Sequence, residues 1–251
     1  MIRDVDFFSN HKTGSSDCLF CDLKFCFVSS RVSRYNRKRV VKIESKFTES
    51  RNPFYLNMKI LIQFAHPALQ KSRVNRLLVQ AACETEDVFV NDLYERYPDF
   101  NIDVKREQQL LLDHDLVVFQ HPFYWYSSPA ILKEWQDLVL EHNFAYGNHG
   151  KALSGKYLCS VISTGGPREA YQVDGYNRYR IMDLLAPFRQ TAFLCGMIYL
   201  PPFLVQGTHA LSEDVDIPLF AAEYRQLLEK IRDDKINLDE VLELESLNSI
   251  Q

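Results

Sequence analysis

From position 58 onwards, short apolar runs alternate along the chain with amphipathic segments. KILIQFA (59–65) is a continuous apolar run, which is typical of a strand buried on both faces of a sheet. Four later segments have a similar character: DVFVNDL (87–93), LVVFQ (116–120), KYLCSVIST (156–164) and MIYLPPFLV (197–205). The pattern therefore predicts five strands.

The segments between these runs carry apolar residues at helical spacing. In SRVNRLLVQAACE (72–84), Val74, Leu77, Leu78 and Ala81 share one face, and Ser72 is suited to cap the helix. Further helices are expected at 107–115, at 129–142 with a proline in the first turn, in two stretches between 177 and 195, and from 218 to about 233. Strands that alternate with helices predict a doubly wound α/β domain, with a parallel sheet covered on both faces.

The first 57 residues differ from the rest of the chain. They carry 11 basic and 6 acidic residues, a net charge of +5, whereas the remainder carries 18 basic and 27 acidic residues, a net charge of −9. They show no sustained periodicity, and the strand pattern begins so abruptly at Met58 that this residue resembles a natural initiator. We therefore expect residues 1–57 to be a disordered arm or sequence upstream of the true start, 58–234 to be the folded domain, and 235–251 to be an acidic, peripheral tail.

Two other hypotheses apply to this N-terminal segment. His11, Cys18, Cys21 and Cys26 could be taken as a zinc site, but their spacing lacks a usual second ligand pair. The basic run RVSRYNRKRVVK could contact nucleic acid or an anionic membrane. We favour the disordered arm over both, and we expect neither a metal nor a nucleic-acid partner.

The composition indicates a cytoplasmic protein. No apolar run approaches the roughly 20 residues needed to cross a bilayer, and the start MIRDVDFF lacks the order of a secretory signal. Cys83, Cys159 and Cys195 sit singly within patterned segments, where we interpret them as small apolar residues rather than disulfide partners.

In a doubly wound sheet, ligands bind beyond the carboxyl ends of the strands, so the segments after the strands are candidates for a site. After the first strand comes AHPALQKSRVNR, which has no phosphate-binding glycine motif. The start of its helix offers unpaired N–H groups and a favourable dipole for a phosphate, although a serine there can be only a cap. The residues concerned are Ser72, Arg73, Val74 and Asn75.

Aromatic residues follow the third strand in QHPFYWYSSP (120–129). They could form a platform for a planar heterocycle or a loop packed back onto the core. These residues are Phe123, Tyr124, Trp125 and Tyr126.

A glycine pair follows the fourth strand. Ser163 and Thr164 supply hydroxyl groups, and Gly165 and Gly166 allow close backbone approach to a ligand, although such a pair can be only a turn. Because three successive core strands end in segments of this kind, we expect them to form one site.

These residues carry a resemblance to a known family. AHP…S-x-x-N, HPFYWYSSPAILKEWQDLV, FAYGNHGKALSGK, STGG and CG-x(4)-PPF together resemble the flavodoxin-like NAD(P)H:quinone oxidoreductases. LYERYPDFNID (93–103) resembles in particular the ancillary subunits of bacterial glutathione-regulated potassium-efflux systems. The resemblance extends from Met58 to about Asp233 and implies a five-stranded sheet of order 2-1-3-4-5.

The resemblance implies FMN as cofactor, with FAD as the alternative. It implies that His66 and residues 72–75 hold the phosphate end, that residues 123–126 line the isoalloxazine ring, and that residues 163–166 close over it. NAD(P)H would deliver hydride to flavin N5, and a quinone or similar acceptor would then take two electrons at the same place.

Two positions bear on the proton transfer that accompanies this reaction. Tyr171 falls where the larger quinone reductases of this family have a catalytic tyrosine, but Asn177 replaces their histidine. Because asparagine cannot donate a proton near pH 7, the acid role would fall on Tyr171, on another group or on solvent. His121 is interpreted as structural.

The resemblance also implies partners. They are the cytosolic domain of a potassium/proton antiporter, which would bring the protein to the inner face of the membrane, and a second copy of the chain in a homodimer. Aromatic residues that could serve the dimer interface are Phe144, Tyr146, Tyr176 and Tyr179. Two alternative functions stay open: a non-catalytic regulatory subunit of the antiporter, and a stress-related quinone or nitro-compound reductase with no transporter.

Overall fold

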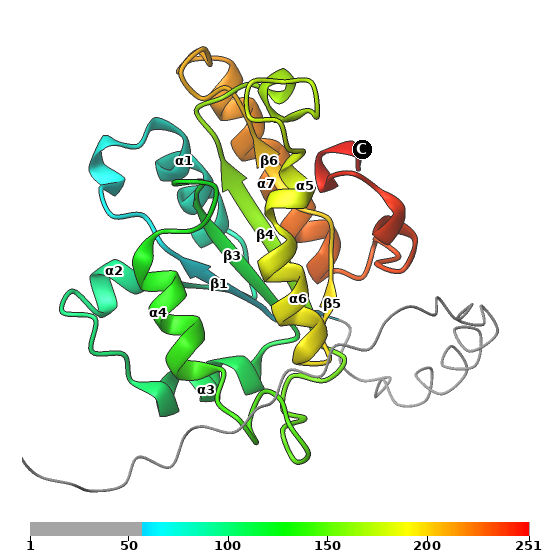
Figure 1. Cartoon of the computed structure of the whole chain (residues 1–251). Coiled ribbons are helices and arrows are strands. Elements are labelled where there is room, and N and C mark those ends of the chain that lie inside the picture. The colour runs from blue at the N-terminus through cyan, green and yellow to red at the C-terminus, as the bar shows by residue number, and fades with distance from the viewer. Residues whose placement is uncertain (1–56, 251) are drawn as a thin grey trace, which may run out of the picture. The chain divides into compact units, whose positions relative to one another are not determined.

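The structure is a computed structural model that describes residues 57–250 (Figure 1). The expectations for the N-terminal arm, including the zinc and basic-run hypotheses, lie outside these residues. None of the helices between residues 57 and 250 is long and apolar enough to cross a membrane.

A parallel sheet forms the centre of the domain (Figure 1). Its strands run in the order β2-β1-β3-β4-β5, and β6 pairs with β4 beyond the end of β5. This order confirms the predicted flavodoxin-like fold. The strands are β1 (Ile60–Phe64), β2 (Val88–Asp92), β3 (Leu116–Pro122), β4 (Tyr157–Ser163), β5 (Ile198–Tyr199) and β6 (Phe203–Val205).

The fifth predicted strand is interrupted. Instead of one strand over 197–205, β5 pairs with Tyr157 and Leu158, and β6 pairs with β4 further along, from Val161 to Ser163. The two segments are separated by Leu200, Pro201 and Pro202. Because proline has no N–H to donate to the ladder, the Pro-Pro pair breaks the strand without changing the order of the sheet.

Helices cover both faces of the sheet (Figure 1). α1 and α7 pack with the β1 side chains Ile60, Ile62 and Phe64 on one face. The intervening Leu61 packs on the other face with side chains of α4 and α6, as the two-residue period of a strand requires. The helices are α1 (Arg73–Cys83), α2 (Leu93–Arg96), α3 (Val104–Asp113), α4 (Ala130–Val139), α5 (Ile181–Leu184), α6 (Ala186–Leu194) and α7 (Asp216–Arg232).

The caps explain where several helices begin. Ser72 accepts a hydrogen bond from the Asn75 N–H at 3.1 Å, which confirms the predicted cap of α1. Asp103 accepts from the Arg106 N–H, so that α3 begins at Val104, three residues before the expected start. Pro129 precedes α4 as its N-cap residue rather than standing inside its first turn.

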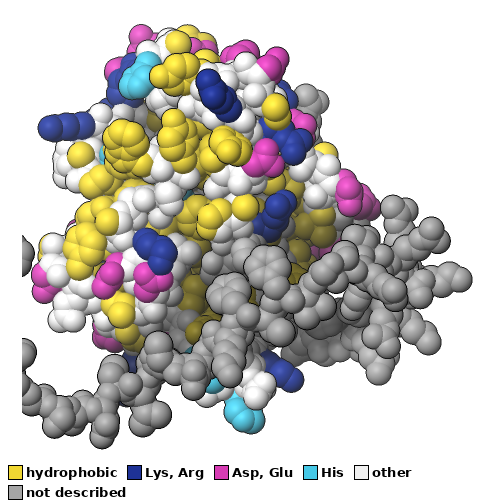
Figure 2. Space-filling view, in the orientation of Figure 1, with side chains coloured by type: hydrophobic (Ala, Val, Ile, Leu, Met, Phe, Trp, Pro, Cys, Tyr) yellow, Lys and Arg dark blue, Asp and Glu magenta, His cyan; other side chains and the backbone are white. Residues whose placement is uncertain are grey.

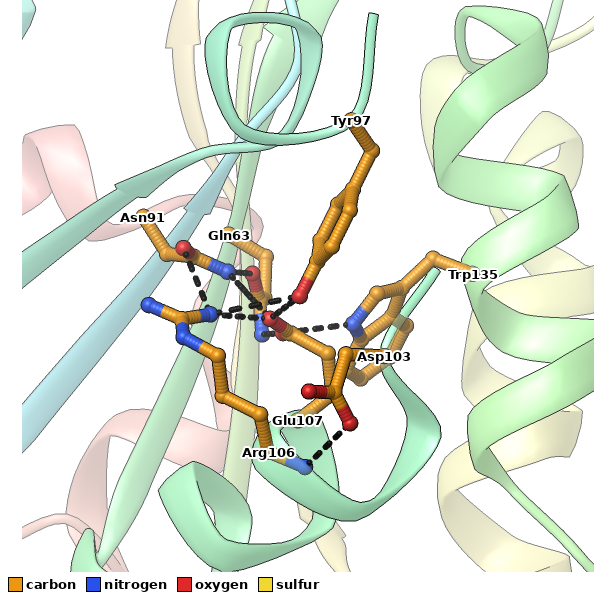
Figure 3. A network of polar contacts seen from close by, with 7 residues as sticks. All are labelled: Gln63, Asn91, Tyr97, Asp103, Arg106, Glu107 and Trp135. Carbon is orange, nitrogen blue, oxygen red and sulfur yellow. Dashed lines mark hydrogen bonds and ion pairs between the residues drawn. The ribbon is translucent and has the colours of Figure 1, made fainter. Parts of the chain in front are cut away.

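A buried carboxylate joins the sheet to α3 and α4 (Figure 3). Glu107 of α3 is fully buried and lies among five side-chain donors. Gln63 Nε2 donates to it at 3.0 Å, Asn91 Nδ2 at 2.9 Å, Tyr97 Oη at 2.6 Å and Trp135 Nε1 at 2.8 Å, and Arg106 forms an ion pair with it. Burial, followed by the hydrogen bond to Glu107, raises the pKa of Tyr97 to about 12. The network therefore ties β1, β2, α3 and α4 together in the interior.

The segment LYERYPDFNID contributes to this network. Its Tyr97 donates to Glu107, and its last residue, Asp103, caps the helix that carries Glu107. These contacts place the segment in the framework of the domain.

The expectation of a peripheral C-terminal tail is wrong. Ile236, Leu238, Val241 and Leu247 are buried in the same cluster as α1 and α7. The Asn248 side chain accepts from the Leu204 N–H at 2.8 Å and donates to its C=O at 3.1 Å, so that it satisfies the free edge of β6. The acidic composition misled the prediction because four apolar residues among the charges are sufficient to anchor the tail.

His121 of β3 makes stability depend on pH. The ring is fully buried, Nδ1 donates to the Pro122 carbonyl at 2.9 Å, and burial lowers the pKa to about 4. The unfolded state, with a histidine pKa near 6.5, therefore binds more protons than the folded state between about pH 4 and 6.5. The free energy of unfolding should accordingly fall as the pH drops through this window.

We expect His121→Leu to remove this dependence. Between pH 7 and pH 5, the wild type should lose about 2 kcal/mol more of its free energy of unfolding than the variant does. Urea unfolding at the two pH values measures the difference, with the exposed His149→Gln as the control. Equal losses in wild type and His121→Leu would show that His121 is not the group responsible.

Candidate functional site

Two adjoining cavities lie at the carboxyl ends of the strands. The first, here called the basic cavity, has a volume of about 520 Å³ and lies between the start of α1 and the segments that follow β1, β3, β4 and β6. It is lined by His66, Ala68, Lys71, Ser72, Arg73, Val74, Asn75, Pro122, Phe123, Tyr124, Ser163, Gly165, Thr208 and His209.

The second cavity, here called the ring cleft, has a volume of about 570 Å³ and shares Phe123 with the first. In Figure 2, hydrophobic side chains and several Lys and Arg side chains gather on the upper part of the face shown, above the carboxyl end of β4. The ring cleft is lined by Phe123, Trp125, Tyr126, Gly166, Pro167, Ala170, Tyr171, Tyr176 and Asn177.

The structure thus brings together nearly all the site residues predicted from the sequence. Thr164 is the exception, because it lines neither cavity. Its hydroxyl donates to the Gly166 carbonyl at 2.7 Å and its N–H to the Val205 carbonyl at 2.9 Å. Thr164 therefore shapes the turn after β4 and attaches it to β6.

The start of α1 presents a buried acceptor that lacks a partner. Asn75 is 2% exposed and lines the basic cavity, and its Nδ2 donates to Ser163 Oγ at 2.8 Å. Among the described residues, no group donates to its Oδ1. Because an unpaired buried acceptor costs free energy, a ligand that donates a hydrogen bond here would be stabilised.

His66 offers a donor to the same cavity. Its Nδ1 accepts from the Ala68 N–H at 3.1 Å, which assigns the proton of the neutral ring to Nε2. Burial lowers the pKa of His66, so the neutral form predominates at pH 7. His66 is thus suited to orient a ligand oxygen rather than to carry a positive charge.

The guanidinium of Arg73 is directed at a neighbouring loop. It donates to the Thr208 carbonyl at 2.8 Å and the Leu211 carbonyl at 3.4 Å, and it forms an ion pair with Glu213 at 3.4 Å. Arg73 therefore has a structural role in addition to the phosphate contact predicted for it. Its side chain fastens the loop after β6 to the first turn of α1.

A protein side chain lies so close to Gly165 that only glycine fits at this position. A Cβ atom at Gly165 would lie 2.8 Å from Nε2 of His209, which is closer than real Cβ contacts allow. The sequence suggested that the glycine leaves room for a ligand. In the structure, the imidazole of His209 occupies the space beside it.

The aromatic segment after β3 is divided between core and surface. Phe123 is 9% exposed, and its ring centroid lies 6.2 Å from that of Tyr171, whereas Trp125 is 93% exposed. Trp125 and Tyr126 have φ values of 49° and 63°, which bulky residues rarely adopt. The loop therefore does not fold back onto the core as a whole, and its backbone strain is of the kind found at functional sites.

Tyr171 lies in the wall of the ring cleft. It is 7% exposed, and burial raises the pKa of its phenol, which therefore keeps its proton at neutral pH. Asn177, which is predicted to replace the histidine of the larger quinone reductases, accepts a hydrogen bond from the Tyr126 hydroxyl at 3.2 Å. Tyr171 is thus the candidate donor of this cleft.

The sequence analysis missed Lys71, Thr208 and His209. Lys71 lies between the predicted strand 59–65 and the predicted helix 72–84. Thr208 and His209 belong to QGTH, which follows the last strand of the sheet. The signal was available, because the rule that ligands bind beyond strand ends applies to this strand as well. Gly207, with a φ of 71°, marks the sharp turn there.

The charge of the basic cavity favours an anion. Lys71 and Arg73 line it, and none of the described residues in its lining is acidic. The start of an 11-residue helix adds unpaired N–H groups and the positive end of its dipole. The arrangement suits a phosphate bonded to a hydroxyl-bearing chain, with a planar group extending to the ring cleft.

The chain is similar to several known proteins. Residues 58–229 match the model of a family described as having a flavodoxin-like fold. The chain is 54% identical over 157 residues to the glutathione-regulated potassium-efflux system ancillary protein KefG of Pectobacterium atrosepticum, which covers 62% of this chain and 86% of that protein.

Two solved structures are also similar. The general stress protein 14 of Treponema denticola, in complex with FMN, is 36% identical with a TM-score of 0.66, over 69% of this chain and 99% of that one. An NADPH-quinone reductase of P. pentosaceus is 35% identical with a TM-score of 0.61, over 67% and 96%.

Proposed function

The chain belongs to the flavodoxin-like family, and we propose that it is an FMN-dependent oxidoreductase that carries two electrons from NAD(P)H to a quinone. The observation that carries this proposal is the basic cavity at a helix start, which shares Phe123 with an adjoining aromatic cleft. FMN has a phosphate at one end and a planar ring at the other. The FMN complex of the Treponema denticola protein and the NADPH-quinone reductase of P. pentosaceus support it.

The residues of the basic cavity fit FMN. Lys71, the Ser72 hydroxyl and the first N–H groups of α1 would hold the phosphate. The unpaired Asn75 Oδ1 would accept a hydrogen bond from a ribityl hydroxyl, and the Nε2–H of His66 would donate one to a ribityl or phosphate oxygen. Phe123 and the other aromatic side chains of the ring cleft would line the isoalloxazine. These assignments apply to the part of FAD that is identical to FMN, so FMN is the simpler choice.

Bound FMN supplies the two-electron chemistry. The protein would hold the ring, admit NAD(P)H and the quinone in turn to the ring cleft, and provide a proton donor. We assign the donor role to the protonated phenol of Tyr171, which would hydrogen-bond to the acceptor. Asn177, held by Tyr126, would take no part in proton transfer.

Removing this hydroxyl should slow turnover. For Tyr171→Phe we expect kcat with a quinone to fall about tenfold, the worth of one hydrogen bond in the transition state, with FMN affinity unchanged. The matched control is Tyr199→Phe, whose hydroxyl pairs with Ser160 away from both cavities. Steady-state kinetics measures the effect, and an unchanged kcat would remove Tyr171 from the mechanism.

We also propose two protein partners. The similarity to KefG supports an ancillary role at a glutathione-regulated potassium-efflux antiporter, at the inner face of the membrane. A second copy of the chain would cover the aromatic rim of the ring cleft, where Trp125 is 93% and Tyr176 is 90% exposed.

The alternative function is regulation of the antiporter without catalysis, and the name of the KefG relatives favours it. One experiment separates the two functions. Purified protein incubated with FMN should oxidise NADPH when a soluble quinone is present, and should do so far more slowly without the quinone. A protein that activates potassium efflux but shows no quinone-dependent oxidation with NADPH or NADH would be regulatory only.

A further inference from the structure

The loop that follows β6 closes the basic cavity and is fixed from two sides. On one side, the Gly207 N–H donates to the Gly166 carbonyl at 2.9 Å, and the Thr208 N–H donates to the Thr164 carbonyl at 3.0 Å. These bonds attach the loop to the turn after β4. The loop is therefore held in place by the turn that carries the glycine pair.

On the other side, Arg73 holds the loop against α1. Its guanidinium donates to the Thr208 carbonyl at 2.8 Å and to the Leu211 carbonyl at 3.4 Å. Both sets of bonds meet at Thr208, the residue before His209. The backbone at His209 is thus held in place by Arg73, the first residue of α1, and by the turn after β4.

The imidazole of His209 has a free polar edge at the basic cavity. The ring lines the cavity and packs against Gly165, where a Cβ atom would lie 2.8 Å from Nε2. Within residues 57–250, neither ring nitrogen has a hydrogen-bond partner. An exposed side chain that is free to donate, on a loop fixed from both sides, is suited to bind a ligand anion.

Two further features indicate that a phosphate group of the ligand lies beside His209. The charge of Arg73 is partly balanced by Glu213, and its Nη1 and Nη2 already donate to loop carbonyls, so Arg73 alone does not balance a phosphate. A phosphate ester carries close to two negative charges and accepts several hydrogen bonds. The unpaired buried Oδ1 of Asn75 independently indicates that a ligand occupies this cavity.

From these contacts we propose that His209 binds the phosphate of the flavin nucleotide and that Arg73 is the residue that positions it. The inference rests on the proposed function, and it adds the loop after β6 as a further wall of the site. His209 would donate to a phosphate oxygen from the side of β6, while α1 donates from its own N–H groups. Arg73 would act mainly through the loop.

The test compares FMN with riboflavin, which lacks the phosphate. The affinity of flavin-free, full-length protein for each is measured by quenching of flavin fluorescence. We expect His209→Ala to weaken FMN binding about tenfold, the worth of one charge-assisted hydrogen bond, and to leave riboflavin binding unchanged. The exposed His149→Ala is the control and should change neither affinity.

The FMN affinities of two further variants test the positioning role of Arg73. Arg73→Gln should weaken FMN binding by a similar factor, and the double variant Arg73→Gln/His209→Ala should be hardly weaker than His209→Ala alone, because both changes remove the same contact. Fully multiplied effects in the double variant would contradict a positioning role for Arg73.

The outcomes separate this inference from the proposed function. If wild-type protein binds neither flavin, the proposed function itself fails. If wild-type protein binds FMN and His209→Ala binds it equally well, or if His209→Ala loses FMN and riboflavin to the same extent, the phosphate contact of His209 is overturned. His209→Gln retains the volume of the side chain and a donor, so it should recover part of the lost FMN affinity, and no recovery would also count against the contact.

Discussion

Glu107→Gln should lower the free energy of unfolding by about 3–5 kcal/mol, the range observed when one partner of a buried charged pair is removed. The carboxylate is fully buried and accepts from four neutral side chains as well as pairing with Arg106. An amide would present its own N–H₂ group to donors that need an acceptor. It would also leave the charge of Arg106 without its buried partner.

Urea unfolding at pH 7 measures this loss. The matched control is Glu134→Gln on the exposed face of α4, which should change the free energy of unfolding by no more than about 0.5 kcal/mol. A loss below about 1 kcal/mol for Glu107→Gln would mean that the network rearranges around the amide and is not a fixed part of the framework.

Gly165→Val should weaken FMN binding about 100-fold, which corresponds to about 2.7 kcal/mol. The new Cβ would lie 2.8 Å from His209 Nε2, so the imidazole or the turn after β4 must move. Either movement fills or distorts the basic cavity. Titration of flavin-free protein with FMN, followed by fluorescence quenching, gives the affinity.

Two variants identify the cause of this loss. Cys159→Ala removes a buried core side chain outside both cavities and should leave FMN affinity within about twofold of wild type. Adding His209→Ala to Gly165→Val removes the clash and should recover part of the affinity. Equal FMN affinity in wild type and Gly165→Val would overturn the role of this turn.

Local patterns along the chain were sufficient to predict most of the fold. A buried parallel strand leaves a short apolar run, as in 59–65, and a helix leaves apolar residues at helical spacing after a capping residue such as Ser72. The interruption by Pro201 and Pro202 was also visible, because proline cannot donate to a ladder. It was missed because the apolar residues on both sides continue the pattern.

Contacts between distant segments could not be predicted in this way. Glu107 receives its hydrogen bonds from residues between 1 and 44 positions away along the chain, and its own position resembles that of an ordinary surface glutamate in a short helix. The same holds for the site. Gly165 depends on His209, and the first residue of α1 fastens a loop 135 positions further on.

The identity of the bound flavin tests the central claim most directly. Purified full-length protein is incubated with excess FMN, freed of unbound ligand and denatured by heat, and the released nucleotide is identified and quantified by chromatography. We predict FMN at one molecule per chain. Protein that releases no flavin after this treatment would contradict the proposed site and the hydride transfer that depends on it.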